Sequence, residues 1–406
     1  MWITIKIAWK NIWRNKVRSL VVIGSIIVGV WSVIFLMSFS LGMGDSYVRN
    51  AVKNQYAHIQ IHHPEFIEDQ EVRFTIELKD QISSIPNVKN YSARIISNGM
   101  LSTGHGAKGV FIKGIIPDKE SKLSDLDKKI VEGDYLSEDD TKGLLVSKKM
   151  IEKFKLKLKS RVVLTIQDQV GTIKYAAYKV SGIYSTGNSM VDESQVFVNE
   201  KGLRNLILGD TVPVNIFHEI AIEVSRPDSI AQVESLLQSI YPRDTIQNYK
   251  ELAPDLALME TQIRTSGFIF IFIFMLALIF GIINTMLMAV LERYRELGML
   301  QAIGMPKLKV FGMVVWETIF MCMAGVPVGF FLGWISVYYF QGRGLDLSAF
   351  SKGNEQFGID SIIYPITDNA LFTQLGIAVA ITSILAAIYP AIKAVNLRPV
   401  EAIRKI

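Results

Sequence analysis

The sequence predicts a membrane protein with four transmembrane helices and a large α+β domain between the first and second of them. Half of the 406 residues are hydrophobic although 20% are charged, and the two kinds of residue are segregated along the chain. Four long stretches carry no charge, whereas the segment between the first two mixes patterns typical of strands and of helices. This composition excludes a soluble globular protein, a disordered chain and a fibrous repeat.

The charge-free stretches are Ser19–Gly44, Thr265–Leu291, Thr318–Gly342 and Asn369–Ile392. About 20 helical residues cross the hydrocarbon layer of a bilayer, so each stretch is long enough to span it. The first is too long for the apolar region of a signal peptide. We therefore expect transmembrane helices at 17–44, 265–291, 310–342 and 369–392.

Basic residues indicate which side of the membrane each connecting segment occupies. They lie before the first span, between the second and third spans, and after the fourth span. The positive-inside rule places these three segments in the cytoplasm, together with both termini. The expected cytoplasmic segments are 1–16, 292–309 and 393–406, and the expected outer segments are 45–264 and 343–368.

The outer segment 45–264 is long enough for one or two compact domains. Its first part predicts a strand at 58–62, a helix over Glu77–Ile85 and a strand over Val88–Ile96. Its last part predicts a strand over Glu219–Val224, a helix over Ser229–Ile240 and a strand from Thr245. The region from about 100 to 210 is rich in strand and turn signals. We expect a two-part domain, with a distal β-rich insertion at about 100–210.

The outer domain shows no strong pattern for chemistry. His58 and His62 could hold a metal on one strand face, but no cluster of Cys, Asp or Glu accompanies them, so alternation in an edge strand is the favoured interpretation. A G-x-x-x-x-G-N-S pattern lacks the lysine of a phosphate-binding loop and predicts a turn. It is formed by Gly182, Gly187, Asn188 and Ser189.

Two further observations limit the function. The only cysteine, Cys322, excludes a disulfide scaffold and a cysteine-based zinc site. A net charge of +5 is too small to indicate nucleic-acid binding. We therefore expect no catalytic residue, no metal site and no nucleic-acid partner.

The segments on the predicted cytoplasmic side are more informative. Residues 1–16 predict an amphipathic helix, because Lys6, Lys10 and Arg14 fall on one face and aromatic and aliphatic residues fall on another. Such a helix lies in the membrane interface. The apolar face is formed by Trp2, Ile5, Trp9 and either Ile12 or Trp13.

The segment after the second span predicts a short helix from Glu292 to Gly304. Glu292 can pair with Arg295 one turn later. Gly304 is the expected C-cap, and Pro306 prevents continuation. The helix also has an apolar edge that suits a protein partner better than water, formed by Leu297, Leu300 and Ile303.

Three motifs resemble those of the MacB/FtsX-like permeases, also called type VII or mechanotransmission ABC transporters. They are R-N-K-x-R-S-L before the first span, E-R-x-R-E-L-G-x-L-x-A-I-G over Glu292–Gly304, and P-A-x-x-A-x-x-L-x-P-x-E-A-I-R over Pro390–Arg404. The resemblance covers the whole chain in order. Gly182–Gly187 followed by Asp192 is most similar to the lipoprotein-releasing LolC/LolE-like branch.

The resemblance implies roles for several segments. The domain at 45–264 would be a MacB-like periplasmic core with Porter-like and Sabre-like parts, and residues 265–406 an FtsX-like permease domain. The segment 292–309 would carry the coupling helix that docks on a cytoplasmic ABC ATPase, which the resemblance implies is a dimer. Its expected contact residues are Glu292, Arg293, Arg295, Glu296, Gly298, Leu300, Ile303 and Gly304.

No cofactor is expected in this chain. It lacks G-x-x-x-x-G-K-[ST] on the cytoplasmic side, so ATP and Mg belong to the partner ATPase. The resemblance also implies a second permease subunit, identical or paralogous. ATP-driven closure of the permease pair would move the outer domains.

Within the membrane, Gly325, Gly329 and Gly333 repeat a small-xxx-small pattern on one helix face. The pattern allows close helix packing within the chain or contact with a second permease subunit. Glu317, near the predicted cytoplasmic end, could be a functional acid. A salt bridge or a carboxylate that reaches the interface is the favoured interpretation.

The resemblance favours a permease subunit that releases lipoproteins from the outer leaflet of the bacterial inner membrane, with acyl chains entering between the first and second spans of paired subunits. Membrane lipids are a further expected partner. One alternative is MacB-like efflux of drugs or peptides. Another is FtsX-like signalling to a cell-wall hydrolase, for which an outer domain of this length is large.

Overall fold

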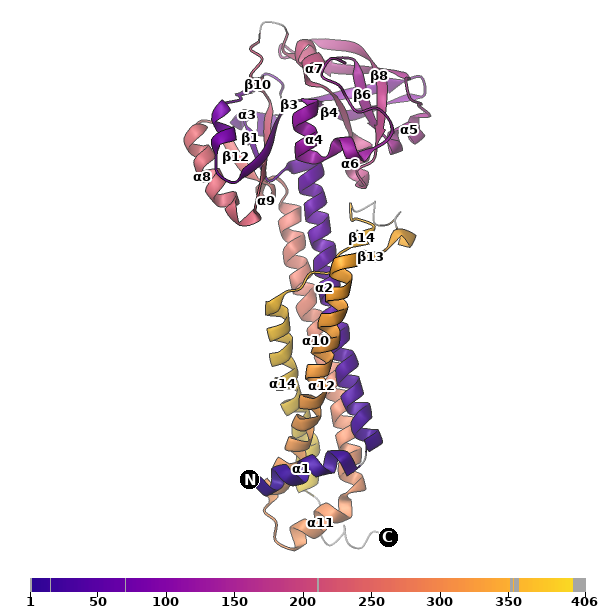
Figure 1. Cartoon of the computed structure of the whole chain (residues 1–406), viewed down its shortest axis with the longest axis vertical. Coiled ribbons are helices and arrows are strands. Elements are labelled where there is room, and N and C mark those ends of the chain that lie inside the picture. The colour runs from indigo at the N-terminus through magenta and orange to yellow at the C-terminus, as the bar shows by residue number, and fades with distance from the viewer. Residues whose placement is uncertain are drawn as a thin grey trace. The chain divides into compact units, whose positions relative to one another are not determined.

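The computed structural model describes residues 2–14, 16–69, 71–209, 212–350, 353 and 358–396. The chain divides into two compact units (Figure 1). The membrane unit comprises Met1–Met43, Thr261–Leu345 and Ile363–Ile406, and the globular unit comprises Gly44–Glu260 and Asp346–Ile362.

The described residues contain four helices that are long and apolar enough to cross a membrane, as predicted. They extend beyond the charge-free stretches, because polar residues at their ends continue the same helices. They are α2 (Lys16–Ala51), α10 (Pro254–Glu292), α12 (Lys307–Arg343) and α14 (Asn369–Val395). Two shorter helices, α1 (Trp2–Arg14) and α11 (Tyr294–Ala302), lie at one end of the membrane unit.

The glycine stripe of α12 faces α2 of the same chain. A Cβ atom on Gly329 would lie 2.9 Å from Val30 Cβ and 3.0 Å from the carbonyl oxygen of Ile27. Gly325 and Gly333 approach Ile26 and Ile34 in the same way. Close backbone approach of this kind is what a small-xxx-small pattern permits. The face is thus occupied by α2, which favours packing within the chain over contact with a second subunit.

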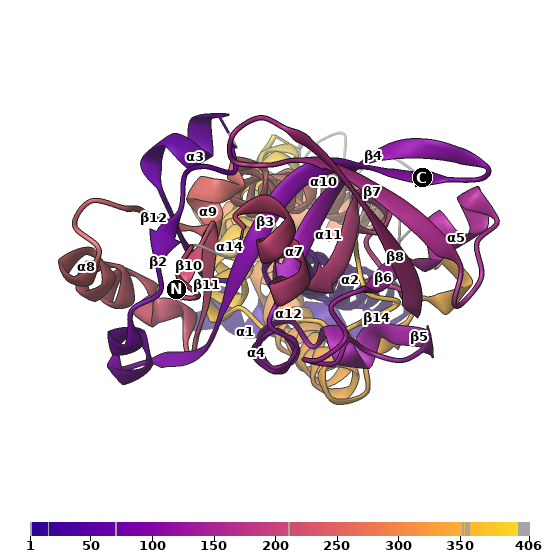
Figure 2. The ribbon, with the colours of Figure 1, turned by 90° about the horizontal axis from the view of Figure 1, so that it is seen from above.

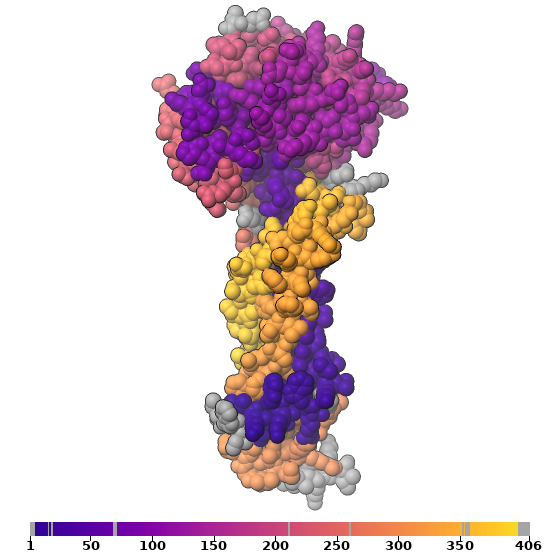
Figure 3. All heavy atoms as spheres, in the orientation of Figure 1, coloured from indigo at the N-terminus to yellow at the C-terminus, as the bar shows by residue number. Residues whose placement is uncertain are grey.

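The amphipathic helix α1 packs across α12 in the membrane unit (Figure 3). Ala8 and Ile12 are buried against it, and the rings of Trp9 and Phe320 meet edge to face. The predicted apolar face is therefore shifted, since Trp9 and Trp13 are only half-buried while the small Ala8 lets the two helices approach.

The globular unit is built on a ten-stranded sheet in the order β12-β1-β11-β3-β4-β9-β6-β8-β5, with β7 pairing with β3 and β8. In that order the strands are β12 (Thr245–Asn248), β1 (Ile59–His62), β11 (Glu219–Val224), β3 (Val88–Thr103), β4 (Gly106–Ile115), β9 (Gln195–Asn199), β6 (Gly143–Ser147), β8 (Ile173–Tyr184) and β5 (Ile130–Gly133). Strand β7 is Arg161–Gln167. Two small sheets pair β2 (Ile76–Glu77) with β10 (Ile216–Phe217) and β13 (Leu345–Asp346) with β14 (Ile362–Ile363).

Strand β3 joins the two predicted parts of this domain. Its first half pairs with β11, where Tyr91 faces Ile222, and its second half pairs with β4 and β7. One hydrophobic cluster runs from Ile59 in β1 to Val180 in β8. The insertion is β-rich as predicted, but it shares a sheet and a core with the flanking parts because one long strand serves both.

Helices flank the sheet (Figure 2). α8 packs beside β12, and α4 and α7 pack beside β3 and β4. The α-helices of this unit are α3 (Pro64–Asp69), α4 (Pro117–Ser124), α5 (Lys148–Phe154), α6 (Ser189–Ser194), α7 (Glu200–Ile207), α8 (Ile230–Ile240) and α9 (Tyr249–Leu252). A π-helix, Val52–Tyr56, follows α2. Short 3-10 helices cover Leu126–Lys129, Pro227–Ser229 and Ser348–Phe350.

The helix predicted over Glu77–Ile85 is wrong. Glu77 belongs to β2, and only a 3-10 helix, Asp80–Ser84, follows it. Ile85 is extended because it precedes Pro86, and a residue before proline is driven out of the helical region. Too few residues then remain for an α-helix.

The edge-strand interpretation of the histidines is also wrong, because β1 lies between β12 and β11. His62 is buried and its ring nitrogens contact the His218 carbonyl and Gln60 Oε1. Among the described residues, no group of three or more His, Cys, Asp or Glu could hold a metal.

The glycine pattern begins with Gly182 inside β8, forms the expected turn after that strand and then caps a helix. The Asn188 side chain accepts hydrogen bonds from the first backbone amides of α6. The Asp192 carboxylate accepts from the amide and hydroxyl of Thr186, at 3.0 and 2.7 Å. The pattern therefore has a structural role.

Candidate coupling site

Helix α11 begins directly after α10. Arg293 interrupts the helical backbone between them, with φ −98° and ψ 18°. At its other end the Gly304 amide donates to the Gln301 carbonyl, and the Met305 amide donates to the Leu300 carbonyl. Gly304 has φ +95°, a conformation that favours glycine. The chain therefore ends the helix with a glycine cap of the Schellman type.

One face of α11 packs into its own membrane unit. Leu297 and Gly298 are buried, and Leu300 is half-buried against the same hydrophobic cluster. Arg295, Met299 and Ile303 lie on the exposed side, and Met299 and Ile303 are 52% and 79% exposed.

The predicted apolar edge therefore needs correction. Leu297 faces the interior and Met299, which the sequence did not single out, takes its place on the surface. The reason is that α11 packs on other helices of the membrane unit, and Leu297 and Leu300 are used for that packing. The surface left for another molecule is formed by Arg295, Met299 and Ile303.

The first polar link of this segment joins α11 to α1. The Arg14 guanidinium donates to both carboxylate oxygens of Glu296, and the distance from Nη1 to Oε2 is 2.9 Å. The hydrogen bond and charge of Arg14 lower the pKa of Glu296. Both side chains are about half exposed, and exposed pairs are worth less than about 1 kcal/mol. Glu296, expected to contact an ATPase, is thus paired within its own chain.

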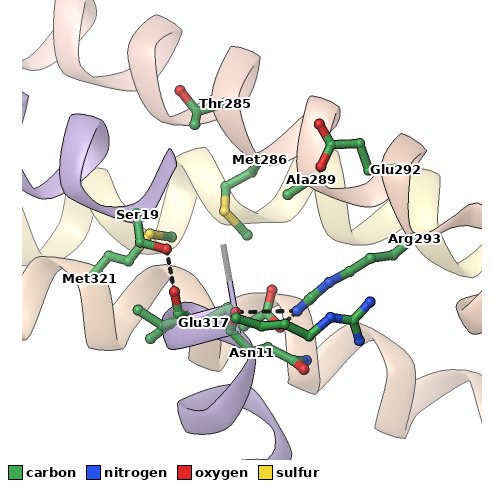
Figure 4. A pocket seen from close by; sticks show the side chains of 11 residues that line it. Asn11, Ser19, Thr285, Met286, Ala289, Glu292, Arg293, Glu317 and Met321 are labelled. Carbon is green, nitrogen blue, oxygen red and sulfur yellow. Dashed lines mark hydrogen bonds and ion pairs between the residues drawn. The ribbon is translucent and has the colours of Figure 1, made fainter. Parts of the chain in front are cut away.

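The second link joins the start of α11 to α12 and α1 (Figure 4). Arg293 Nη1 lies 2.7 Å from Glu317 Oε1, and Arg293 Nη2 donates to the Asn11 carbonyl at 3.3 Å. The Glu317 side chain is only 8% exposed. The salt-bridge interpretation of Glu317 is confirmed. Losing one partner of a buried pair leaves an uncompensated charge, which is costly.

A third link joins α11 to α14, where Gln301 Nε2 donates to the Ala394 carbonyl at 3.0 Å. The segment 292–304 is therefore connected by polar contacts to α1, α12 and α14. A displacement of α11 would be transmitted to all three. The tail motif at Pro390–Arg404 lies only partly within the structure, since residues 397–406 are outside the described part of the chain.

Sequence comparisons agree with this architecture, which is that of a membrane permease with an α+β domain after its first helix. The family described as "MacB-like periplasmic core domain" matches residues 19–240, more than half of the chain. The family described as "FtsX-like permease C-terminal" matches residues 268–399. The chain belongs to the MacB/FtsX-like family of ABC transporter permeases.

Among named relatives, the lipoprotein-releasing system transmembrane protein LolC of Neisseria meningitidis is 22% identical over 95% of this chain and 94% of that protein. The pyoverdine export ATP-binding/permease protein PvdT of Pseudomonas putida is 22% identical over 98% of this chain, which spans 59% of that protein. The periplasmic region of MacB from Actinobacillus actinomycetemcomitans aligns with 52% of this chain and 95% of its own, at 15% identity and a TM-score of 0.36.

Proposed function

We propose that this chain is the permease subunit of an ABC transporter and that α11 couples it to ATP hydrolysis on a separate cytoplasmic ATPase. The observation that carries the proposal is the arrangement of α11. It exposes Arg295, Met299 and Ile303 on one side and is linked to α1, α12 and α14 on the other. ATP and Mg would be bound by the partner, because this sequence has no G-x-x-x-x-G-K-[ST] motif.

The proposed location is the bacterial inner membrane, with both termini and α11 in the cytoplasm and the globular unit outside. The basic residues near α1, α11 and the C-terminal end support this orientation. A second permease subunit would complete the membrane part. The ATPase would move α11 and, through it, α2 and α10, which continue into the globular unit.

The proposed activity is release of lipoproteins from the inner membrane towards the outer membrane. The alignment with LolC over nearly the full length of both proteins supports this choice. Export of a small molecule is the second candidate, supported by the alignment with PvdT.

The proposal is tested by Ile303→Asp in proteoliposomes that contain the permease and its ATPase. A charge on the apolar docking surface disfavours the interface, so we expect ATP-dependent lipoprotein release to fall strongly while insertion is normal. Leu258→Asp is the control, because Leu258 is also exposed but lies near the start of α10, outside the segment 292–309. Unchanged release and ATPase activity in Ile303→Asp would show that α11 is not the coupling element. Pyoverdine-like export in place of lipoprotein release would favour the second candidate.

A further inference from the structure

Asp360, which lies between α12 and α14 just before β14, is bound to side chains of α2 (Figure 1). Its carboxylate accepts hydrogen bonds from the Ser46 hydroxyl at 2.9 Å and from Asn50 Nδ2 at 2.8 Å. Its amide donates to Ser46 Oγ at 3.2 Å, and Asn50 Nδ2 also donates to the Gly358 carbonyl at 3.2 Å. Residues 358–360 are therefore fastened to two positions of α2 that lie one helical turn apart.

The same segment follows α2 further, towards the start of α14. A Cβ atom on Gly42 would collide with the Tyr364 carbonyl oxygen, so the missing side chain is what lets the two backbones touch. The Ile366 amide donates to the Ser38 carbonyl at 3.0 Å. Residues 358–366 thus form a strap along α2. Its contact positions on the helix are four residues apart and share one face, and they are Ser38, Gly42, Ser46 and Asn50.

The first residue of the strap also touches the turn before α6 in the β-rich insertion. Gly358 has φ +70°, and a Cβ atom built on it would lie 2.7 Å from Asn188 Nδ2 and 3.3 Å from Asn188 Cβ. Asn188 uses its Oδ1 to cap α6, so its amide group faces the strap while its carbonyl group holds the helix. The turn therefore has a second role besides capping, because it joins the insertion to the segment that leads into α14.

The contacts of the strap are of a kind that can be exchanged. Asp360 is exposed, so water can replace the hydrogen bonds that it makes with α2. The face of α2 that the strap covers is about three turns, or roughly 18 Å, long. A fully extended segment of the strap's length reaches about 26 Å. The strap is thus longer than its path and has the slack to shift along the helix without breaking the chain.

We propose that the strap couples α14 to the Asn188 turn and slides along α2 during each transport cycle. This rests on the proposed function, in which ATP hydrolysis on a partner moves the membrane helices. Helices α2 and α10 continue directly into the globular unit, and the strap gives α14 its own connection to the β-rich insertion. Shifts of about one helical turn between packed elements are a known form of conformational change.

An engineered disulfide tests the contact. Cys322→Ala removes the only native cysteine. Asn188→Cys with Gly358→Cys then brings together two Cβ atoms that are 3.3 Å apart in the structure, close to the spacing in disulfides. Mild oxidation of the full-length protein in membranes, without any ATPase, should cross-link most of it. Failure of the folded double variant to cross-link would overturn the contact, and this result does not depend on the proposed function.

The same disulfide tests the sliding in proteoliposomes that contain the ATPase. Locking a conformational step limits turnover, so oxidation should lower permease-stimulated ATP hydrolysis and lipoprotein release by roughly tenfold or more, and a reductant should restore both. The matched controls are Asn188→Cys alone and Gly358→Cys alone, which should keep their rates when oxidised. Unchanged ATP hydrolysis in the cross-linked protein would overturn the sliding. Loss of lipoprotein release alone, in oxidised and reduced protein alike, would instead contradict the proposed substrate.

A second variant keeps the proposal testable, because a cysteine at the positive φ of Gly358 is strained and the double variant can fail to fold. Asn50→Ala removes the two hydrogen bonds that Asn50 donates to the strap. Hydrogen exchange of the Asp360 amide should become roughly tenfold faster, since local opening becomes easier. Arg49→Ala is the control, because Arg49 pairs with Asp45 instead. Equal protection of the Asp360 amide in both variants would contradict the strap.

Discussion

Both units contain a buried arginine–glutamate pair, but the Arg14–Glu296 pair of the membrane unit has different surroundings from the Arg94 network of the globular unit. In the globular unit, Arg94 of β3 donates to both oxygens of Glu120 in α4, at 2.9 and 2.7 Å, and to Glu219 in β11 at 2.5 Å. All three side chains are at most 5% exposed. In the membrane unit, by contrast, the Arg14–Glu296 pair is half-exposed and joins two short helices at the unit's end.

The difference shows how one kind of pair can serve two purposes. Burial alone would raise the pKa of Glu120 and of Glu219, but the charge and hydrogen bonds of Arg94 lower both. That network is satisfied only in one geometry, which makes the sheet junction rigid. The exposed pair costs little to break, because water can solvate both groups. It therefore suits a contact that changes during a transport cycle.

The largest expected effect tests the buried network of Arg94, Glu120 and Glu219. Arg94→Met removes the guanidinium that neutralises the buried Glu120 and Glu219, and breaking such a pair costs about 3–5 kcal/mol. The free energy of local unfolding of β3 and β11, measured by hydrogen exchange, should fall by this amount. Lys89→Met is the control, since Lys89 is on the same strand but its pair with Glu223 is exposed. Equal losses in both variants would contradict the comparison.

The second effect is a pH dependence of the globular unit. Burial lowers the pKa of His218 to about 4. Neutral His218 accepts from the Ile96 amide at Nδ1 and donates to the Val72 carbonyl from Nε2. Between pH 6.5 and 4 the unfolded chain binds the extra proton, so stability is complete above 6.5 and is lost as the pH falls towards 4. The full loss is about 3 kcal/mol.

Hydrogen exchange of the globular unit across this pH range checks the expectation. His218→Gln should reduce the pH dependence, although His58 and His62, whose pKa burial also lowers, should retain part of it. His105→Gln, in an exposed turn, is the control. A pH profile that is identical in His218→Gln and the unmodified protein would exclude this role of His218.

The third effect concerns helix packing in the membrane unit. Gly329→Leu places a side chain against Val30 and the Ile27 carbonyl, and overpacking of this kind costs about 1–3 kcal/mol. All six tryptophans lie in the membrane unit, so tryptophan fluorescence during unfolding reports this loss separately. Gly312→Leu, on the same helix with no neighbour within 4 Å, should have little effect. Similar stability of the two variants would mean that α12 does not pack on α2 through the glycine stripe.

Glu296→Lys should have the smallest effect on stability, and it is the sharpest test of the exposed Arg14–Glu296 pair. Loss of an exposed pair should cost less than about 1 kcal/mol, yet ATP-dependent transport should fall because α11 loses its link to α1. The charge exchange Arg14→Glu with Glu296→Lys should restore transport. Failure of the exchange, with lost binding of the ATPase, would show that Glu296 contacts the partner directly.

Local properties of the sequence were sufficient for much of the fold. The four spans follow from uninterrupted apolar length, and β1, β11, α8 and β12 follow from short-range periodicity. The glycine that ends α11 was recognisable because its conformation depends only on its neighbours. The motifs that identify the family are likewise contiguous in the chain.

Tertiary structure alone decided which of these elements meet. Glu296 finds its partner 282 residues away in Arg14, and no local pattern indicates that pairing. The glycines of α12 could have served another subunit, but the side chains of α2 occupy their face. Leu297 faces the interior because other helices of the membrane unit pack on it. Strand β3 unites the two expected parts of the globular unit because its two halves pair with different strands. Burial and pairing depend on the shapes of surfaces that are distant in the sequence. These surfaces come together only when the chain folds.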